Sequence, residues 1–113
     1  MNLSSLSTML IILWEYHVKP ENRVEFETRY SPKGGWAEMF HKSAGYLGTE
    51  LIRSRGETDR YITIDRWTSM EHYEAFLSRH EKEYSTLDDQ SAGLTESESL
   101  IGIWDLVPPQ NPL

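Results

Sequence analysis

The sequence predicts a single α+β domain of the ferredoxin-like class, with the element order β-α-β-β-α-β and one four-stranded antiparallel sheet. Three observations support this prediction. The 113 residues are enough for one hydrophobic core. Apolar residues recur at every second position in some segments and at helical spacing in others, which distinguishes strands from helices. The order of these segments is that of a split β-α-β unit, in which both helices lie on one face of the sheet.

The first half of the chain is expected to form a strand and an interrupted helix. Residues 9–18 are rich in branched and aromatic side chains and alternate with a period of two, which is typical of a strand. A proline then favours the first turn of a helix over residues 20–30. The sequence Ser-Pro-Lys-Gly-Gly at 31–35 breaks this helix, which we expect to resume over residues 36–42.

Two strands joined by a hairpin follow. Residues 46–54 have strand composition, a polar loop with glycine occupies 56–59, and a second strand is expected over 60–67. The sequence Thr-Ser-Met-Glu at 68–71 has the form of a capping box, which marks the start of a helix.

The helix after this capping box is predicted from a stripe of side chains spaced three and four apart. The stripe consists of Met70, Tyr73, Leu77, His80, Tyr84 and Leu87. Residues 88–97 are polar and are expected to form a turn, and residues 98–107 form the last strand, which Pro108 ends.

Both faces of the predicted sheet are apolar, although two helices can cover only one of them. In the first strand Ile12, Trp14 and Tyr16 alternate with Ile11 and Leu13. The third strand shows the same alternation, and in the last strand Leu100, Trp104 and Leu106 are expected to oppose Ile101, Ile103 and Val107. An apolar sheet face exceeds what a soluble monomer usually exposes. We therefore expect a homodimer in which the sheet of a second copy covers this face.

Composition excludes several classes of function. The chain carries 18 acidic and 11 basic residues, a formal charge of −7, and no local basic cluster, so nucleic acid is not an expected partner. It has no cysteine, which excludes thiolate metal sites and cysteine nucleophiles. No signal peptide or transmembrane segment is evident, so a cytoplasmic protein without membrane contact is expected. We expect a flexible extension over residues 1–8, the domain over 9–108 and a tail over 109–113.

Three motifs together resemble the antibiotic biosynthesis monooxygenase (ABM) domains of the dimeric α/β-barrel superfamily. They are V-K-P at 18–20 followed by Phe26, G-Y-L-G-T-E-L at 45–51, and D-R-W-T-S at 65–69 with Tyr73 and Phe76. The resemblance extends over about residues 10–107. It implies a dimeric α/β barrel, which agrees with the two-sided sheet.

The resemblance also implies a chemistry. Some relatives oxidise quinols or anthrones with molecular oxygen and no cofactor, in a cavity lined by an asparagine, a tryptophan and a tyrosine. Here Trp67 and Tyr73 match the last two, whereas Thr63 stands where those enzymes have the asparagine. A threonine hydroxyl can still hydrogen-bond a substrate oxygen, but it does not present the paired donor and acceptor of an amide. Haem degradation, the activity of another branch, is not expected, because Phe76 occupies the tryptophan position of that branch.

The candidate residues also have structural interpretations. Trp67 and Tyr73 are either core aromatics or the wall of a cavity. His80 is either a packed side chain or the base that removes a phenolic proton. Glu15 and His17 form either a structural pair, the preferred interpretation, or a second proton-transfer candidate.

Further side chains are expected around the cavity, and no metal is expected. Trp36 and Phe40 follow the break in the first helix and are expected to cover the cavity with Phe76. His72 and His80 are separated by two helical turns, roughly 12 Å, which is too far for one metal ion. The leading hypothesis is a homodimeric, cofactor-free monooxygenase of a small quinol- or anthrone-like aromatic molecule. The alternative is a non-catalytic dimer that binds a hydrophobic small molecule.

Overall fold

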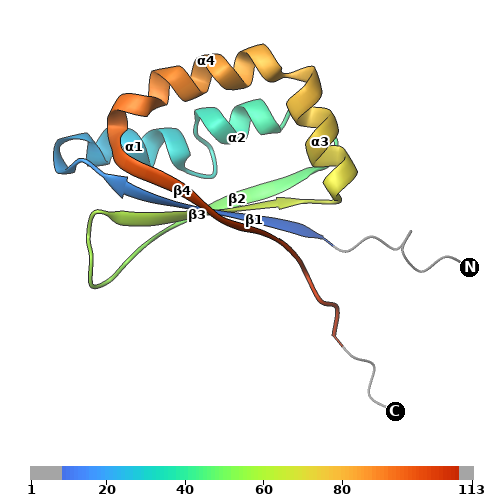
Figure 1. The fold of residues 1–113 in the computed structure, drawn as a ribbon, viewed down its shortest axis with the longest axis horizontal. Coiled ribbons are helices and arrows are strands. Elements are labelled where there is room, and N and C mark those ends of the chain that lie inside the picture. Colours follow the sequence, from blue (N-terminus) through green and yellow to red (C-terminus); the bar gives the residue numbers. More distant parts are fainter. Residues whose placement is uncertain (1–8, 110–113) are drawn as a thin grey trace, which may run out of the picture.

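The computed structural model describes residues 9–109 and contains one four-stranded antiparallel sheet with helices on one face (Figure 1). The strand order is β2-β3-β1-β4, so the two strands of each β-α-β unit are separated by one other strand. The strands are β1 (Leu10–Val18), β2 (Tyr46–Arg53), β3 (Arg60–Trp67) and β4 (Thr95–Asp105). The helices are α1 (Arg23–Tyr30), α2 (Gly35–Phe40), α3 (Met70–Arg79) and α4 (Glu81–Ser91). The predicted fold class is confirmed.

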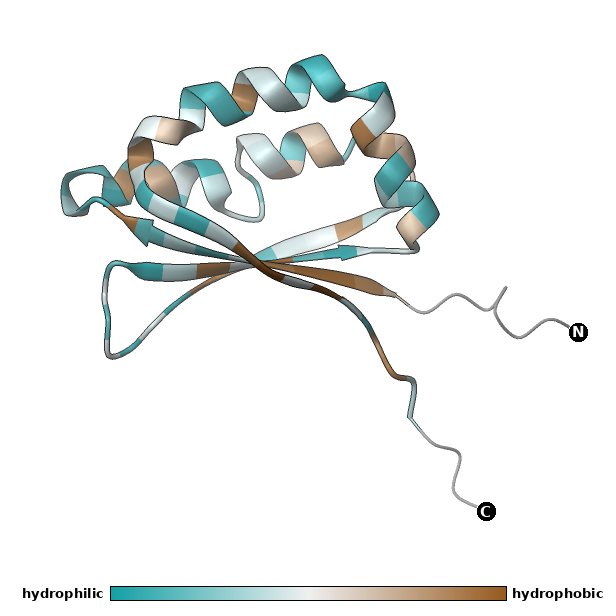
Figure 2. Ribbon diagram, viewed as in Figure 1, coloured by the Kyte–Doolittle hydropathy of each residue, from teal (hydrophilic) through white to brown (hydrophobic). Residues whose placement is uncertain are grey.

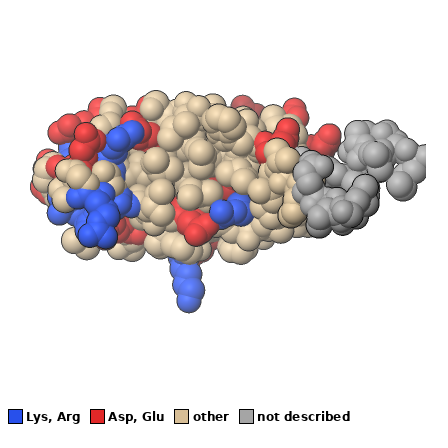
Figure 3. Space-filling view, turned by 90° about the horizontal axis from the view of Figure 1, so that it is seen from below, with Lys and Arg blue, Asp and Glu red and all other residues tan. Residues whose placement is uncertain are grey.

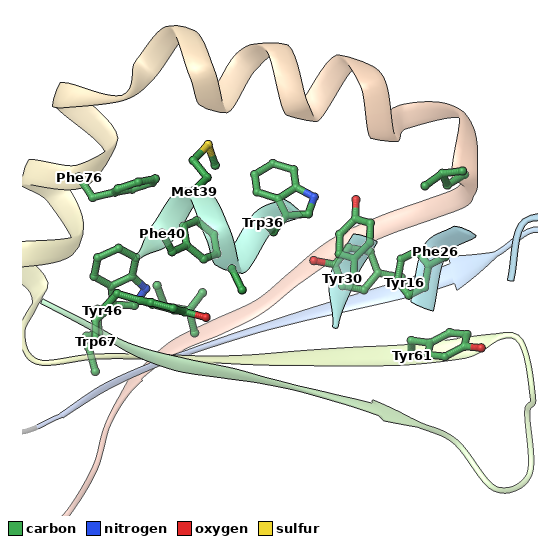
Figure 4. Packing of buried hydrophobic residues seen from close by; sticks show 14 of the residues in the cluster. Tyr16, Phe26, Tyr30, Trp36, Met39, Phe40, Tyr46, Tyr61, Trp67 and Phe76 are labelled. Atoms are coloured by element: carbon green, nitrogen blue, oxygen red, sulfur yellow. The ribbon is translucent and has the colours of Figure 1, made fainter. Parts of the chain in front are cut away.

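Strand alternation sends one set of side chains toward the helices. In β3 every second residue is buried, from Tyr61 through Thr63 and Asp65 to Trp67. The same alternation in β1 buries Ile12 and Tyr16. These side chains meet the buried face of α1 and α2 and form one core, which contains the aromatic side chains of Figure 4.

The long predicted helix is in fact two helices. It breaks at His80, whose backbone (φ −116°, ψ 27°) is not helical, and α4 begins at the next residue. One straight helix from Met70 to Ser91 would be about 33 Å long, longer than a strand of eight residues at about 27 Å. The break turns α4 back over α2 and α1, as Figure 1 shows.

Three boundaries differ from the prediction around this helix. Ser69 is the N-cap in place of Thr68, because its side chain accepts a hydrogen bond from the backbone N–H of His72. The predicted turn at 88–97 is wrong over its first part, since α4 continues to Ser91. Its residues are polar because Asp88, Asp89 and Gln90 are exposed on α4. The last strand consequently begins at Thr95.

A bulge also changes the predicted faces of β4. The register shifts opposite Leu13 and Trp14, so Leu100 pairs with Trp14 and Ile103 pairs with Ile12. Leu100 and Ile103 therefore share the helix side of the sheet, whereas Trp104, opposite Ile11, lies on the other side. The prediction that Leu100 and Trp104 share a face is wrong, because one extra residue reverses the alternation.

The face of the sheet away from the helices is uncovered and largely apolar, as predicted. We call this surface the open face, and it contains Ile11, Leu13, Ile52, Ile62, Ile64 and Trp104. Ile52 and Trp104 are 47% and 53% exposed. Hydrophobic residues follow β1 and the middle of β4 in Figure 2, and the view from this side in Figure 3 shows a broad uncharged area.

Residues 1–8, the predicted extension, and 110–113 of the predicted tail lie outside the described residues. Within residues 9–109 no helix is long and apolar enough to span a membrane.

Candidate functional site

A small cavity of about 40 Å³ lies between the sheet and the helices. Side chains from all four strands and from α1, α2 and α4 line it. The lining residues are Trp14, Tyr16, Tyr30, Trp36, Phe40, Thr49, Thr63, Asp65, Tyr84, Asp88 and Glu98. This volume holds one to three water molecules. The cavity therefore has polar groups on its wall but is nearly filled by its own side chains.

Two groups of aromatic rings, shown in Figure 4, form the core from which the aromatic side chains of the cavity wall come. One group contains Trp67 with Phe40, Tyr46 and Phe76, whose ring centroids lie 5.3 to 5.6 Å from that of Trp67. The other group contains Tyr16, Phe26, Tyr30 and Tyr61. Trp36 lies between the two groups, 6.0 Å from both Tyr30 and Phe40. Tilted and edge contacts of this kind are favourable for aromatic rings.

Two hydrogen-bonded hydroxyl groups face the cavity from the sheet. The hydroxyl of Tyr16 on β1 lies 3.1 Å from Oγ1 of Thr63 on β3. Both side chains are buried, at 6% and 3% exposure. Burial raises the pKa of the Tyr16 hydroxyl well above its ordinary value. The pair is therefore a neutral group that can offer one donor to a ligand oxygen.

Asp65 is a buried carboxylate next to these hydroxyls. Thr49 Oγ1 donates a hydrogen bond to its Oδ1 at 2.5 Å, and the hydroxyls of Tyr46 and Thr49 are also hydrogen-bonded to each other. Asp65 is 8% exposed. Burial, partly opposed by the hydrogen bond from Thr49, raises its pKa to about 6.

Two further carboxylates lie at the rim of the cavity, where α4 approaches β4. They belong to Asp88 and Glu98, and both residues are exposed. Partial burial, followed by the charge of Asp88, raises the pKa of Glu98. The lining contains no lysine, arginine or histidine, and none of the ion pairs formed within residues 9–109 involves its carboxylates. The cavity is thus negatively charged.

The predicted site residues fall into three groups. Thr63, Trp36 and Phe40 line the cavity. Trp67, Tyr73 and Phe76 lie behind this lining, with the Trp67 and Tyr73 rings 5.4 Å apart. Trp67 is fully buried, and its indole N–H has no hydrogen-bond partner within the described part of the chain. The catalytic and binding roles expected of these six residues stay predictions.

His80 and the Glu15–His17 pair lie apart from the cavity. His80 is in a surface hollow between α3 and the segment that follows α2, and its Nδ1 is 3.1 Å from Glu83 Oε1. Glu15 and His17 are on the open face, where His17 Nε2 is 3.3 Å from Glu15 Oε1 and Arg60 Nη2 is 2.6 Å from Glu15 Oε2. A hydrogen bond from Arg60 lowers the pKa of Glu15. The preferred interpretation of Glu15 and His17 as a structural pair stays a prediction.

Sequence reasoning missed Asp65 as a site residue, although a signal was present. The alternation of β3 places it on the same face as Tyr61, Thr63 and Trp67, and a carboxylate among buried positions is a candidate functional group. Thr49, Tyr84 and Glu98 gave no comparable signal, because they reach the cavity from elements whose packing is not evident in the sequence. Within residues 9–109 no group of three or more metal-ligating side chains is found.

One family model matches the chain. It is the antibiotic biosynthesis monooxygenase family, and the match covers residues 9–83, more than half of the chain. No curated protein matches in sequence.

Solved structures with the same fold include SnoaB, described as a cofactor-independent oxygenase from Streptomyces nogalater. A variant of that protein is similar with a TM-score of 0.69 and 15% identity, over 91% of this chain and 97% of that one. A proposed antibiotic biosynthesis monooxygenase from Bordetella bronchiseptica is similar with a TM-score of 0.68 and 17% identity, over 89% and 99%. One from Nitrosomonas europaea has a TM-score of 0.65 and 14% identity, over 93% and 96%. At these identities the likeness shows the fold.

Proposed function

The chain belongs to the antibiotic biosynthesis monooxygenase family, and from that premise we propose that it inserts one oxygen atom of O₂ into a small hydroxylated aromatic compound. The observation that carries this proposal is the cavity between sheet and helices, where aromatic walls surround a buried hydroxyl pair and a buried carboxylate. Aromatic walls with a few placed polar groups are typical of a small-molecule site. The likeness to SnoaB, a cofactor-independent oxygenase, supports a reaction without flavin or metal.

For an anthrone-like substrate the reaction balances as follows. The substrate loses its acidic proton to a base, and the resulting anion transfers one electron to O₂. The two radicals combine through a C–O bond, and protonation gives a hydroperoxide. The O–O bond then breaks with loss of the hydrogen on the same carbon, so that one oxygen atom remains as a carbonyl and the other leaves as water.

Each wall of the cavity has a role in this proposal. The Tyr16–Thr63 hydroxyl pair hydrogen-bonds the substrate oxygen, and Trp36 and Phe40 stack against its rings. Trp67 and Tyr73 hold these side chains in place from behind. The aromatic side chains of the wall limit the access of water to the reactive anion and peroxide.

Substrate entry requires the cavity to widen. About 40 Å³ is far less than a tricyclic molecule occupies, so a lining element has to move. Helix α4 is the element that can move, because Ser91 is its only buried residue and it begins at the break at His80. Its outward displacement removes Tyr84 and Asp88 from the cavity and makes room for a planar substrate.

The nearly filled cavity also favours the alternative function, a dimer that binds a hydrophobic small molecule without catalysis. The test is oxygen uptake by the purified, metal-free protein over a panel of anthrones, naphthoquinols and catechols. Uptake above the spontaneous rate supports the oxygenase. Thr63→Val, which removes the cavity hydroxyl at nearly constant volume, should then lower kcat/KM, whereas Val24→Ala on an exposed surface should not. Binding of panel compounds without uptake by any of them favours the alternative.

We also propose that two copies pack their open faces together. ABM proteins are typically dimeric. The exposed Ile52 and Trp104 and the partly exposed apolar side chains of β1 and β3 supply a surface that association would remove from water. Ile64→Glu places a charge at the centre of this face and should give a monomer in light scattering, with Val24→Glu as the control. A folded Ile64→Glu protein that keeps the dimer mass would exclude this interface.

A further inference from the structure

We propose that Asp65 is the general base of the oxygenation, with Thr49 as the residue that positions its carboxylate. This inference rests on the proposed function and assigns the proton transfer with which it begins. It replaces His80 and the Glu15–His17 pair as candidates for that step, because those side chains lie outside the cavity.

The sheet register fixes the position of Asp65. On β3 it lies between Thr63 and Trp67 on the helix side, and it pairs with Ile12 on β1 and with Thr49 on β2. Thr49 is therefore directly across the strand pair, where side chains are about 5 Å apart at Cβ. Asp65 is thus held by regular secondary structure on both sides, with its carboxylate toward the cavity.

One carboxylate oxygen is fixed and the other is available. Oδ1 accepts the hydrogen bond from Thr49, whose hydroxyl is in turn hydrogen-bonded to that of Tyr46. Oδ2 has no hydrogen-bond partner within residues 9–109. Asp65 lines the cavity, and Oδ2 is not one of the fully buried unpaired polar atoms of residues 9–109, so a ligand in the cavity can reach it and donate a hydrogen bond to it. The hydroxyl of a bound phenol or enol is such a donor.

The other polar groups around the cavity are less suited than Asp65 to act as a base. Burial, and to a smaller extent the charge of Asp65, raises the pKa of four neighbouring hydroxyls, those of Tyr16 on β1, Tyr46 on β2, Tyr73 on α3 and Tyr84 on α4. These hydroxyls stay protonated at neutral pH and can only donate or share a proton. The carboxylates of Asp88 and Glu98 are exposed at the rim, and α2 contributes only the uncharged Trp36 and Phe40 to the lining.

The proton transfer conserves atoms and charge. The substrate O–H bond breaks, its electron pair stays on the substrate oxygen, and the proton binds Oδ2 of Asp65. After oxygen adds, the protonated Asp65 returns this proton to the outer peroxide oxygen, and the carboxylate is restored. With a pKa of about 6, Asp65 is mostly ionised at pH 7 yet basic enough to accept a proton.

The test is the pH dependence of kcat/KM for oxygen uptake with an anthrone that the wild type oxidises. The wild-type rate should fall below pH about 6 as Asp65 is protonated. Asp65→Asn keeps the shape and the acceptor for Thr49, and should lower kcat/KM by about 100-fold or more and remove the acid limb of the profile. The hydrogen bond from Thr49 stabilises the ionised form of Asp65. Thr49→Val removes this bond and should therefore raise the pKa of Asp65 and move the acid limb to higher pH.

Asp89→Asn is the matched control, since Asp89 is exposed on α4 and outside the cavity. It should leave both the rate and the profile unchanged. An active wild type together with an Asp65→Asn variant that keeps the acid limb would overturn the role of Asp65 and leave the oxygenase proposal standing. A wild type that oxidises no compound of the panel would overturn both.

Discussion

A carboxylate kept for catalysis at a buried position should destabilise the fold, and Asp65→Asn tests this directly. The pKa of Asp65 rises from 3.8 to about 6 on folding because burial disfavours its charged form. One pKa unit corresponds to about 1.4 kcal/mol. Ionised Asp65 therefore lowers the free energy of unfolding by about 3 kcal/mol, a large part of the stability of a small domain.

The magnitude of this destabilisation depends on pH, and it changes between the pKa of the unfolded chain, 3.8, and that of the folded protein, about 6. Below about pH 4 the carboxyl group becomes neutral in both the folded and the unfolded chain, and it no longer lowers the free energy of unfolding. As the pH rises from 4 to 6, the unfolded chain ionises first and the free energy of unfolding falls. Above about pH 6 the free energy of unfolding is lowered by the full amount. Asp65→Asn should therefore match the wild type at pH 4 and be more stable at pH 7 by about 1 to 3 kcal/mol, the lower value allowing for burial of the amide.

The measurement is urea unfolding followed by tryptophan fluorescence at several pH values from 4 to 8, at one protein concentration so that association contributes equally. The chain has four tryptophans to report the transition. Asp89→Asn should show no pH-dependent difference. If Asp65→Asn were less stable than the wild type at pH 7, or differed by the same amount at every pH, the argument from burial would be refuted.

Two further stability predictions follow from packing. Trp67→Ala removes a fully buried indole and should lower the free energy of unfolding by about 3 to 5 kcal/mol, and a loss below 1 kcal/mol in urea titration would show that the core relaxes around the gap. Gly45→Ala places a Cβ atom 2.3 Å from Cβ of His72 and should cost about 1 to 3 kcal/mol, whereas Gly56→Ala, with nothing within 4 Å, should be near neutral in thermal melting. Equal melting temperatures for these two variants would mean that α3 shifts freely away from residue 45.

The proposed chemistry depends on neighbouring polar groups with different proton affinities. The buried Tyr16 and Thr63 hydroxyls are positioned to donate to a substrate oxygen, and Asp65, on the same strand as Thr63, is positioned to accept its proton. The resemblance to ABM domains implies that Thr63 stands where some oxygenases of the family have an asparagine. The neighbouring Tyr16 hydroxyl, 3.1 Å from Thr63 Oγ1, adds a second polar oxygen, so that the pair presents one donor and acceptor lone pairs from two adjacent atoms.

The sequence by itself determined the fold class, most strands and the two-sided sheet. Strands are periodic over two residues, so the alternation of β1 and β3 could be followed without any tertiary information. The bounds of β3 were predicted to the residue. The motif around Trp67 indicated the family, because it combines a strand end, a helix start and their spacing.

Only the tertiary structure decided the end of the second helical segment and the composition of the cavity. The break at His80 is set by the fit of α4 over α2, and no residue type in the sequence marks it. The partnership of Asp65 with Thr49 depends on the cross-strand register of β2 and β3, which shifts between Tyr46 and Gly48. Periodicity shows which face a side chain occupies, whereas register and packing decide what it meets there.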